Sequence, residues 1–131
     1  MKLLLDTHVL VWFAAEPSRL RQNVVDALQS ERSEIVVSVA SWWELGIKHA
    51  LGRLEGVLPP EQLRDWWLGH ETVRELTITA RHVLMATSLP PHHRDPFDRV
   101  LLAQAQMEGA TFVSSDGMMR GYGVPLLEAQ R

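Results

Sequence analysis

Short apolar runs that alternate with helical patterns constrain this chain more than any other feature of its sequence. Residues 3–5 are all leucine, and residues 35–39 form a second run rich in β-branched side chains. Runs that lack a polar alternation are typical of strands buried on both faces, as in parallel sheets. The sequence therefore predicts a layered α/β fold with a mainly parallel central sheet.

The same patterns predict the remaining elements along the chain. Expected strands are 3–5, 35–39, 73–76, 110–113 and 124–127. Expected helices are 7–15, 17–30, 41–51, 59–68, 79–87 and 96–108. A length of 131 residues suits one compact domain, so we expect residues 1–131 to form a single unit.

The composition limits the class of protein. A hydrophobic fraction of 46% and a charged fraction of 22% are ordinary for a globular protein, and no segment is apolar enough to span a membrane. Cysteine is absent, which excludes a disulfide framework and a thiolate metal site and suits a reducing, cytoplasmic location. The net charge of −3 argues against a passive nucleic-acid binder but not against an enzyme that holds phosphate through metal ions.

Two acidic residues follow predicted strands. Asp6 comes directly after the run 3–5, and Asp116 follows the expected strand 110–113 after two serines. Ligand sites in open parallel sheets lie beyond the carboxyl ends of the strands. Both carboxylates are therefore expected at the edge of the sheet where chemistry takes place.

Several of the acids also have a purely structural explanation. Asp6 suits the N-cap of the helix that follows it, and Asp95 suits the N-cap of the helix 96–108, with Asp98 in its first turn. Glu44 precedes Lys48 by one turn, which is the spacing of an ordinary surface ion pair. Taken singly, each residue fits its structural explanation better than a catalytic one.

The surroundings of Glu44 favour a functional interpretation of the set. Two tryptophans precede Glu44, and Leu45 and Ile47 follow it, so we expect the carboxylate at the margin of the core. A buried carboxylate is costly unless hydrogen bonds or a cation compensate it. A hard divalent ion with oxygen ligands would provide that compensation.

Four segments of the sequence carry a family resemblance: LLLDTHVLVW, SWWELGIKHALGRL, LPPHHRDPFDRVLLAQAQMEGATFVSSD and YGVPLL. In this order and spacing the chain resembles PIN-domain proteins, and more narrowly the VapC-type toxins of bacterial toxin–antitoxin pairs, from about residue 1 to residue 127. The resemblance implies a three-layer α/β/α sandwich.

The resemblance also implies a set of site residues. The positions that match the metal-binding and catalytic acids of the family are Asp6, Glu44, Asp98 and Asp116. Thr7 and Ser114 match hydroxyl positions near that centre, although the family commonly has threonine where Ser114 stands. Asp95 matches an acid of this subgroup and is expected to have a supporting role.

The implied activity is that of an endoribonuclease that depends on Mg²⁺ or Mn²⁺ and hydrolyses RNA phosphodiester bonds. The resemblance further implies a homodimer and a cognate antitoxin protein that blocks the site. Two alternatives stay open at this point. One is a housekeeping RNA-processing nuclease of the same fold, and the other is a non-catalytic α/β interaction module whose acids only cap helices.

Other hydrolase classes fit the sequence less well. The six histidines include no HExxH zinc motif, and no phosphate-binding GxxxxGK[ST] loop occurs. A haloacid-dehalogenase-type phosphatase requires an acid two positions after its nucleophilic aspartate, and His8 stands at that position.

Two tryptophan doublets, at 42–43 and 66–67, lie in predicted helices. Adjacent helical residues point about 100° apart, so both rings of a doublet cannot easily share one buried face. We therefore expect exposed aromatic rings that are available to a dimer or partner surface.

Overall fold

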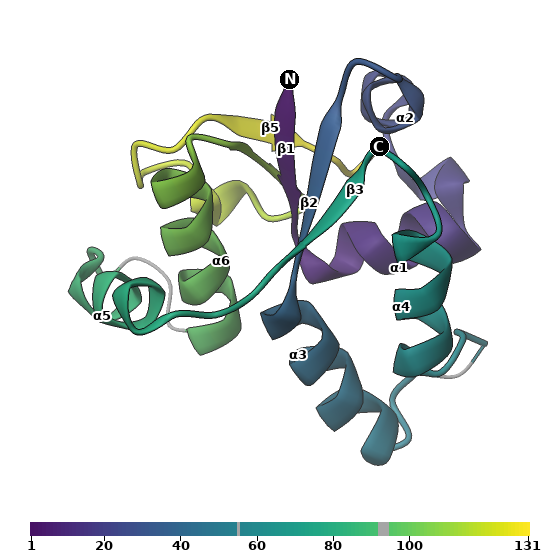
Figure 1. Cartoon of the computed structure of the whole chain (residues 1–131), viewed down its shortest axis with the longest axis horizontal. Helices are drawn as coiled ribbons and strands as arrows, with labels where there is room; N and C mark the ends of the chain where they lie inside the picture. The colour runs from purple at the N-terminus through teal and green to yellow at the C-terminus, as the bar shows by residue number, and fades with distance from the viewer. Residues whose placement is uncertain (55, 92–94) are drawn as a thin grey trace.

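A five-stranded sheet forms the centre of the computed structural model, which describes residues 1–54, 56–91 and 95–131 (Figure 1). The strands run in the order β3-β2-β1-β4-β5, and each pairing is parallel. Their bounds are β1 Lys2–Leu5, β2 Glu34–Ser38, β3 Val73–Leu76, β4 Thr111–Ser114 and β5 Leu126–Glu128. The predicted parallel sheet is confirmed.

Helices cover both faces of this sheet, which confirms the three-layer sandwich (Figure 1). On one face lie α1 (Thr7–Ala15), α2 (Gln22–Gln29) and α4 (Pro60–Leu68); on the other lie α5 (Ala80–Ser88) and α6 (Pro96–Glu108). Helix α3 (Val39–Ala50) continues from the carboxyl end of β2, and two 3-10 turns, η1 (Pro17–Arg19) and η2 (Gly117–Met119), complete the described elements.

The alternation of side chains along each strand divides the core into two layers. Leu3 and Leu5 pack with Trp67 on the face of α1, α2 and α4. Leu4 packs with Phe112 and Leu101 on the opposite face. All six side chains are at most 1% exposed, and this explains why the strands carry apolar residues at consecutive positions.

The register brings the ends of β1 and β4 together. Leu5 pairs with Val113, and the backbone N–H of Asp6 donates to the carbonyl oxygen of Val113 at 2.9 Å. Asp6 and Ser114 therefore follow paired residues on neighbouring strands, at the carboxyl edge of the sheet.

The predicted helix 17–30 is wrong in its first half. The chain forms the short turn η1 and then becomes extended at Leu20, which is buried and makes an isolated antiparallel bridge with Gln130. The N–H of Arg21 donates to the carbonyl of Ala129 at 2.8 Å, so α2 begins only at Gln22. A contact with the far end of the chain overrides the local helical pattern.

The prediction of a strand over 35–39 extends one residue too far, because β2 ends at Ser38. Ser38 closes β2 and caps α3, because its hydroxyl accepts a hydrogen bond from the N–H of Ala40 at 3.0 Å. Val39 is thus the first residue of the helix. Among the described residues no helix has the length and apolarity needed to cross a membrane.

Candidate active site at the carboxyl edge of the sheet

Asp6 lies at the centre of the candidate site, between β1 and α1. Its side chain is the N-cap of α1, with Oδ1 accepting a hydrogen bond from the N–H of His8 at 2.7 Å. The Nδ1 atom of His8 lies 3.9 Å from the same oxygen. Asp6 is only 3% exposed, so the capping role predicted from the sequence and a place in the site coexist in one residue.

Ser114 connects Asp6 to Asp116. Its hydroxyl donates to Oδ2 of Asp6 at 2.6 Å and accepts from the backbone N–H of Asp116 at 3.1 Å. Ser114 is fully buried at the end of β4, and Asp116 lies half-buried two residues beyond it. One hydroxyl group therefore positions two of the predicted acids.

Glu44 lies on α3 and is 7% exposed. Its Oε2 accepts from the ammonium group of Lys48 at 2.8 Å, so the predicted ion pair exists, although its carboxylate is buried rather than on the surface. The other oxygen, Oε1, is buried and has no hydrogen-bond partner among the described residues. A buried polar atom without a partner costs about 1–3 kcal/mol, which makes this oxygen a candidate ligand atom.

Two further hydroxyl groups link α1 to α3. Thr7 donates to Oγ of Ser41 at 3.1 Å, and both side chains are buried. The sequence predicted Thr7 as a supporting residue but gave no indication of Ser41. The one sequence feature that could have indicated Ser41 is its position one turn before Glu44 on the same helix.

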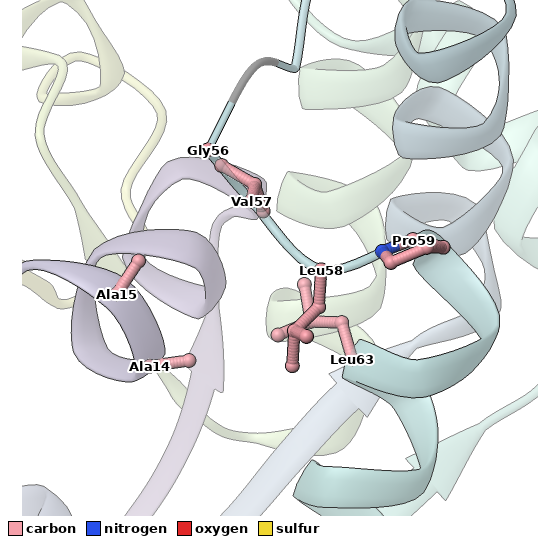
Figure 2. A pocket seen from close by; sticks show the side chains of 7 residues that line it. All are labelled: Ala14, Ala15, Gly56, Val57, Leu58, Pro59 and Leu63. Carbon is pink, nitrogen blue, oxygen red and sulfur yellow. The ribbon is translucent and has the colours of Figure 1, made fainter.

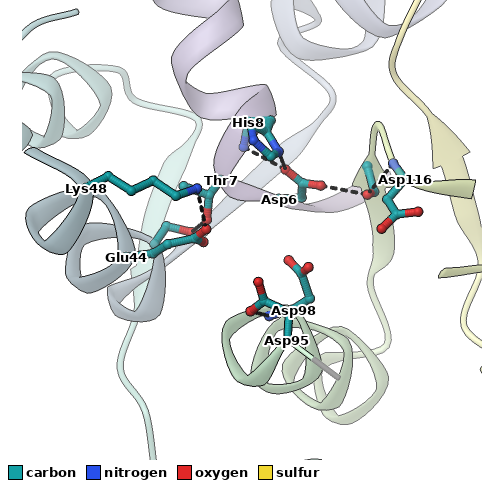
Figure 3. Close-up of polar contacts among 10 residues, drawn as sticks. Asp6, Thr7, His8, Glu44, Lys48, Asp95, Asp98 and Asp116 are labelled. Atoms are coloured by element: carbon teal, nitrogen blue, oxygen red, sulfur yellow. Dashed lines mark hydrogen bonds and ion pairs between the residues drawn. The ribbon is translucent and has the colours of Figure 1, made fainter. Parts of the chain in front are cut away.

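The remaining acids come from α6. Asp95 is the N-cap of that helix, with Oδ1 accepting from the N–H groups of Phe97 at 2.9 Å and Asp98 at 3.3 Å. Asp98 stands in the first turn and is half-buried. In Figure 3 the carboxylate of Asp98 points from α6 towards Asp6.

Figure 3 shows how the acids are arranged around Asp6. Glu44 on α3 lies on one side, Asp116 in the loop after β4 on the other, and Asp98 on α6 below. Within residues 1–54, 56–91 and 95–131, no three acidic or histidine side chains stand at the spacing of a finished metal site. The acids share one edge of the sheet, and their side chains would have to move for them to bind one ion together.

The donor set nevertheless suits a divalent cation. Carboxylate oxygens are the ligands that Mg²⁺ and Mn²⁺ prefer, and each oxygen that accepts one hydrogen bond keeps a second lone pair. The orphaned Oε1 of Glu44 adds a buried negative atom for which the described chain offers no partner. On this observation, the residues fit a hard metal ion.

Two ion pairs outside this centre have shifted pKa values. Arg64 donates hydrogen bonds from Nε and Nη2 to Glu75, at 2.6 and 3.0 Å, and these lower the pKa of that carboxyl group. Trp42 donates a third bond to Glu75 at 2.9 Å. In the same way Arg74 lowers the pKa of Glu108. These ion pairs connect β3 to α4 and to α6 and take no part in the candidate site.

An apolar pocket of about 420 Å³ lies elsewhere, between the end of α1 and the segment before α4 (Figure 2). Its described lining is aliphatic and includes Ala14, Leu58, Pro59 and Leu63. No titratable side chain is among these lining residues, so the pocket offers no group for hydrolysis.

The tryptophan doublets divide as predicted. Trp67 is 1% exposed and donates from its indole to the carbonyl of Leu10, whereas Trp66 is 38% exposed. Trp43 is 62% exposed, while Trp42 is half-buried. The role of the exposed rings in a dimer stays a prediction.

Comparisons with known proteins bear on the family and the fold of the chain. The PIN domain family model matches residues 3–124. Ribonuclease VapC22 of Mycobacterium tuberculosis is 32% identical over 126 residues, which cover 94% of this chain and 93% of the relative.

Solved structures resemble the fold. VapBC2 from Rickettsia felis, bound to a DNA fragment from their promoter, has a TM-score of 0.72 at 16% identity, covering 99% of this chain and 100% of that chain. A toxin–antitoxin complex from Klebsiella pneumoniae has a TM-score of 0.65 at 16% identity, with 95% of each chain covered. At these identities the two structures support the architecture alone.

Proposed function

Because the chain belongs to the PIN domain family, we propose that it is a metal-dependent endoribonuclease that hydrolyses RNA phosphodiester bonds. Support comes from the relative named Ribonuclease VapC22 and from the acids at the carboxyl edge of the sheet. The proposal includes a cytoplasmic location and a single PIN-like domain over residues 1–131.

Four carboxylates are proposed to hold Mg²⁺ or Mn²⁺: those of Asp6, Glu44, Asp98 and Asp116. When bound, such an ion supplies positive charge to the phosphate and leaving oxygen and lowers the pKa of attacking water. Asp6 and Asp98 are proposed as the principal ligands, with Glu44 and Asp116 completing the site directly or through water. Thr7, Asp95 and Ser114 are proposed to support these ligands.

The chain's own hydrogen bonds give Asp6 a fixed orientation. Ser114 donates to one oxygen and the N–H of His8 to the other, so the carboxylate cannot rotate freely. Groups held in this way need little reorganisation when charge develops on the substrate. Lys48 holds one oxygen of Glu44 in the same manner and leaves Oε1 available.

The observation that carries the proposal is this buried, unpartnered Oε1 beside three further acids. An ion pair with Lys48 accounts for one oxygen of Glu44 but not for the other, because the buried Oε1 has no hydrogen bond that compensates its desolvation. A cation held there would compensate it.

The test is cleavage of RNA by purified protein with and without Mg²⁺ or Mn²⁺. We expect cleavage only with metal, and a loss of about a hundredfold or more in Asp6→Asn, which keeps a side chain able to cap α1. Asp26→Asn, on α2, is the matched control. Metal-independent cleavage, or full activity in Asp6→Asn, would reject the proposal.

We further propose that the protein is the toxin of a toxin–antitoxin pair, forms a homodimer and is inhibited by a cognate antitoxin. The similarity to VapC22 and to toxin–antitoxin structures supports this role. Growth arrest on expression that Asp6→Asn relieves would separate a toxin from a housekeeping nuclease.

A further inference from the structure

A recess of about 360 Å³ opens beside the acidic centre and shares residues with it. Thr7 and His8, which follow Asp6 in sequence, form part of its lining, as does Lys48, the partner of Glu44. A molecule in this recess would therefore lie directly next to the proposed cleavage site.

The charge of the recess is opposite to that of the acids. Arg19, Lys48 and Arg53 line it, and its described lining contains no carboxylate. Lys48 is bound to Glu44, and Arg19 lies 3.2 Å from Glu16. Arg53 is exposed and has no ion pair in the part of the chain that the structure describes. In a chain of net charge −3, this local positive charge favours an anionic ligand.

An aromatic wall stands beside these cations. Trp12 is half-buried, and its ring lies 5.8 Å from that of His8, with an angle of 32° between the two planes. The guanidinium carbon of Arg19 lies 5.0 Å from the Trp12 ring centroid. Apolar side chains such as Val11 and Leu45 complete the lining. The ligand should therefore combine a flat apolar ring with negative charge.

We propose that this recess binds one nucleotide of single-stranded RNA, adjacent to the phosphodiester held at the acids. The base stacks against Trp12 and His8, and Arg53 and Arg19 contact the flanking phosphate. Aromatic platforms next to a positive groove are how proteins bind single strands. The proposal rests on the proposed ribonuclease function, for which it names a substrate subsite.

Binding is tested apart from cleavage, with Asp6→Asn protein, a chelator and a short fluorescent single-stranded RNA. We expect Arg53→Gln to raise Kd about threefold to tenfold and to lower the slope of log K against log salt by about one. The matched control is Arg32→Gln, which removes an exposed arginine at the opposite edge of the sheet and should leave both values unchanged.

Stacking is tested with substitutions of Trp12 in the same assay. Trp12→Leu should weaken RNA binding by about fivefold or more, whereas Trp12→Phe, which keeps an aromatic face, should retain most of it. Trp66→Leu, on α4, is the control for loss of an exposed indole. Because Trp12 packs against the core, a thermal unfolding curve is recorded for each variant.

The outcomes distinguish a failure of the proposed subsite from a failure of the proposed ribonuclease function. Equal effects of Arg53→Gln and Arg32→Gln, or equal binding by Trp12→Leu and Trp12→Phe, would overturn the subsite. So would an acidic peptide that occupies the recess in preference to RNA. Wild-type protein that cleaves no RNA, yet binds it through Arg53 and Trp12, would reject the ribonuclease and retain the subsite.

Discussion

Ser114 and Asp6 are 108 residues apart in sequence, yet the hydroxyl of one donates to the carboxylate of the other at 2.6 Å. The parallel pairing of β1 with β4 places them on adjacent strand ends. A single turn of the backbone after Ser114 then places Asp116 within reach of the same hydroxyl, through its N–H. The sheet thus supplies the framework, and one serine joins two acids within it.

Replacement of this hydroxyl should reduce activity without unfolding the protein. We expect Ser114→Ala to lower cleavage about tenfold to a hundredfold, because Asp6 loses the donor that orients it. Ser114→Thr keeps a hydroxyl and should restore most of the activity. The measurement is the initial rate of RNA cleavage, with thermal unfolding to confirm the fold. An Ala variant as active as wild type would show that the bond does not matter.

Neutralising Glu44 should have opposite effects on stability with and without metal. Without metal, Glu44→Gln should be at least as stable as wild type, because the amide oxygen can still accept from Lys48 and the negative charge on the buried, unpartnered Oε1 is removed. With metal, the wild type should gain about 2.7 kcal/mol at a hundredfold excess over Kd, and the variant clearly less.

The measurement is the change in Tm on adding Mn²⁺ or Mg²⁺ to chelator-treated protein. Glu61→Gln, an exposed change of the same charge on α4, should behave like wild type. The same metal-induced rise in the Glu44 variant would remove this residue from the proposed metal site.

Asp95 should act mainly as a helix cap. Asp95→Ala should lower the free energy of unfolding by about 1 kcal/mol, because two N–H groups at the start of α6 lose their acceptor. Asp95→Ser can still cap the helix and should retain both stability and cleavage. Urea unfolding and cleavage rates check this, and an inactive but stable Ser variant would assign the carboxylate to the reaction.

Acid should weaken the ion pair between Arg64 and Glu75. Hydrogen bonds from Arg64 lower the pKa of Glu75 in the folded protein, so the pair stabilises the fold above the ordinary glutamate pKa, about 4.3. That contribution is lost as the pH falls through the lowered value. Since both side chains are partly exposed, solvent screens the pair and keeps this contribution small.

Urea unfolding at a series of pH values tests this for wild type and Glu75→Gln. The variant should be less stable at neutral pH, and the two curves should converge in acid. Glu31→Gln, in the turn before β2, serves as the control. A difference that persists unchanged at about pH 3 would contradict the ionic origin.

Local patterns were sufficient to predict most of the fold. The apolar runs marked the strands, and capping residues such as Asp6 and Asp95 marked helix starts. The error at 17–30 arose because Leu20 pairs with Gln130, a contact that no local window contains. The error at the end of β2 has a local cause instead, since the hydroxyl of Ser38 caps the helix that begins at Val39.

The candidate site was predicted less completely. Residue type and strand position indicated Asp6 and Asp116, the apolar neighbours of Glu44 indicated that residue, and the family resemblance added Asp98. Ser41 was missed because its partner, Thr7, lies 34 residues away and serines are common at helix starts. Whether the four acids hold a metal together stays a prediction, because side-chain rotamers decide their final spacing.

The central position of β1 has a consequence for how this protein is made. Translation produces Asp6 before α6 and before β4, the strand that pairs with β1. A nascent chain lacks the Ser114 bond and two of the four acids until that point. For the proposed ribonuclease, a truncated chain released early from the ribosome would therefore lack the complete site needed to cleave messenger RNA.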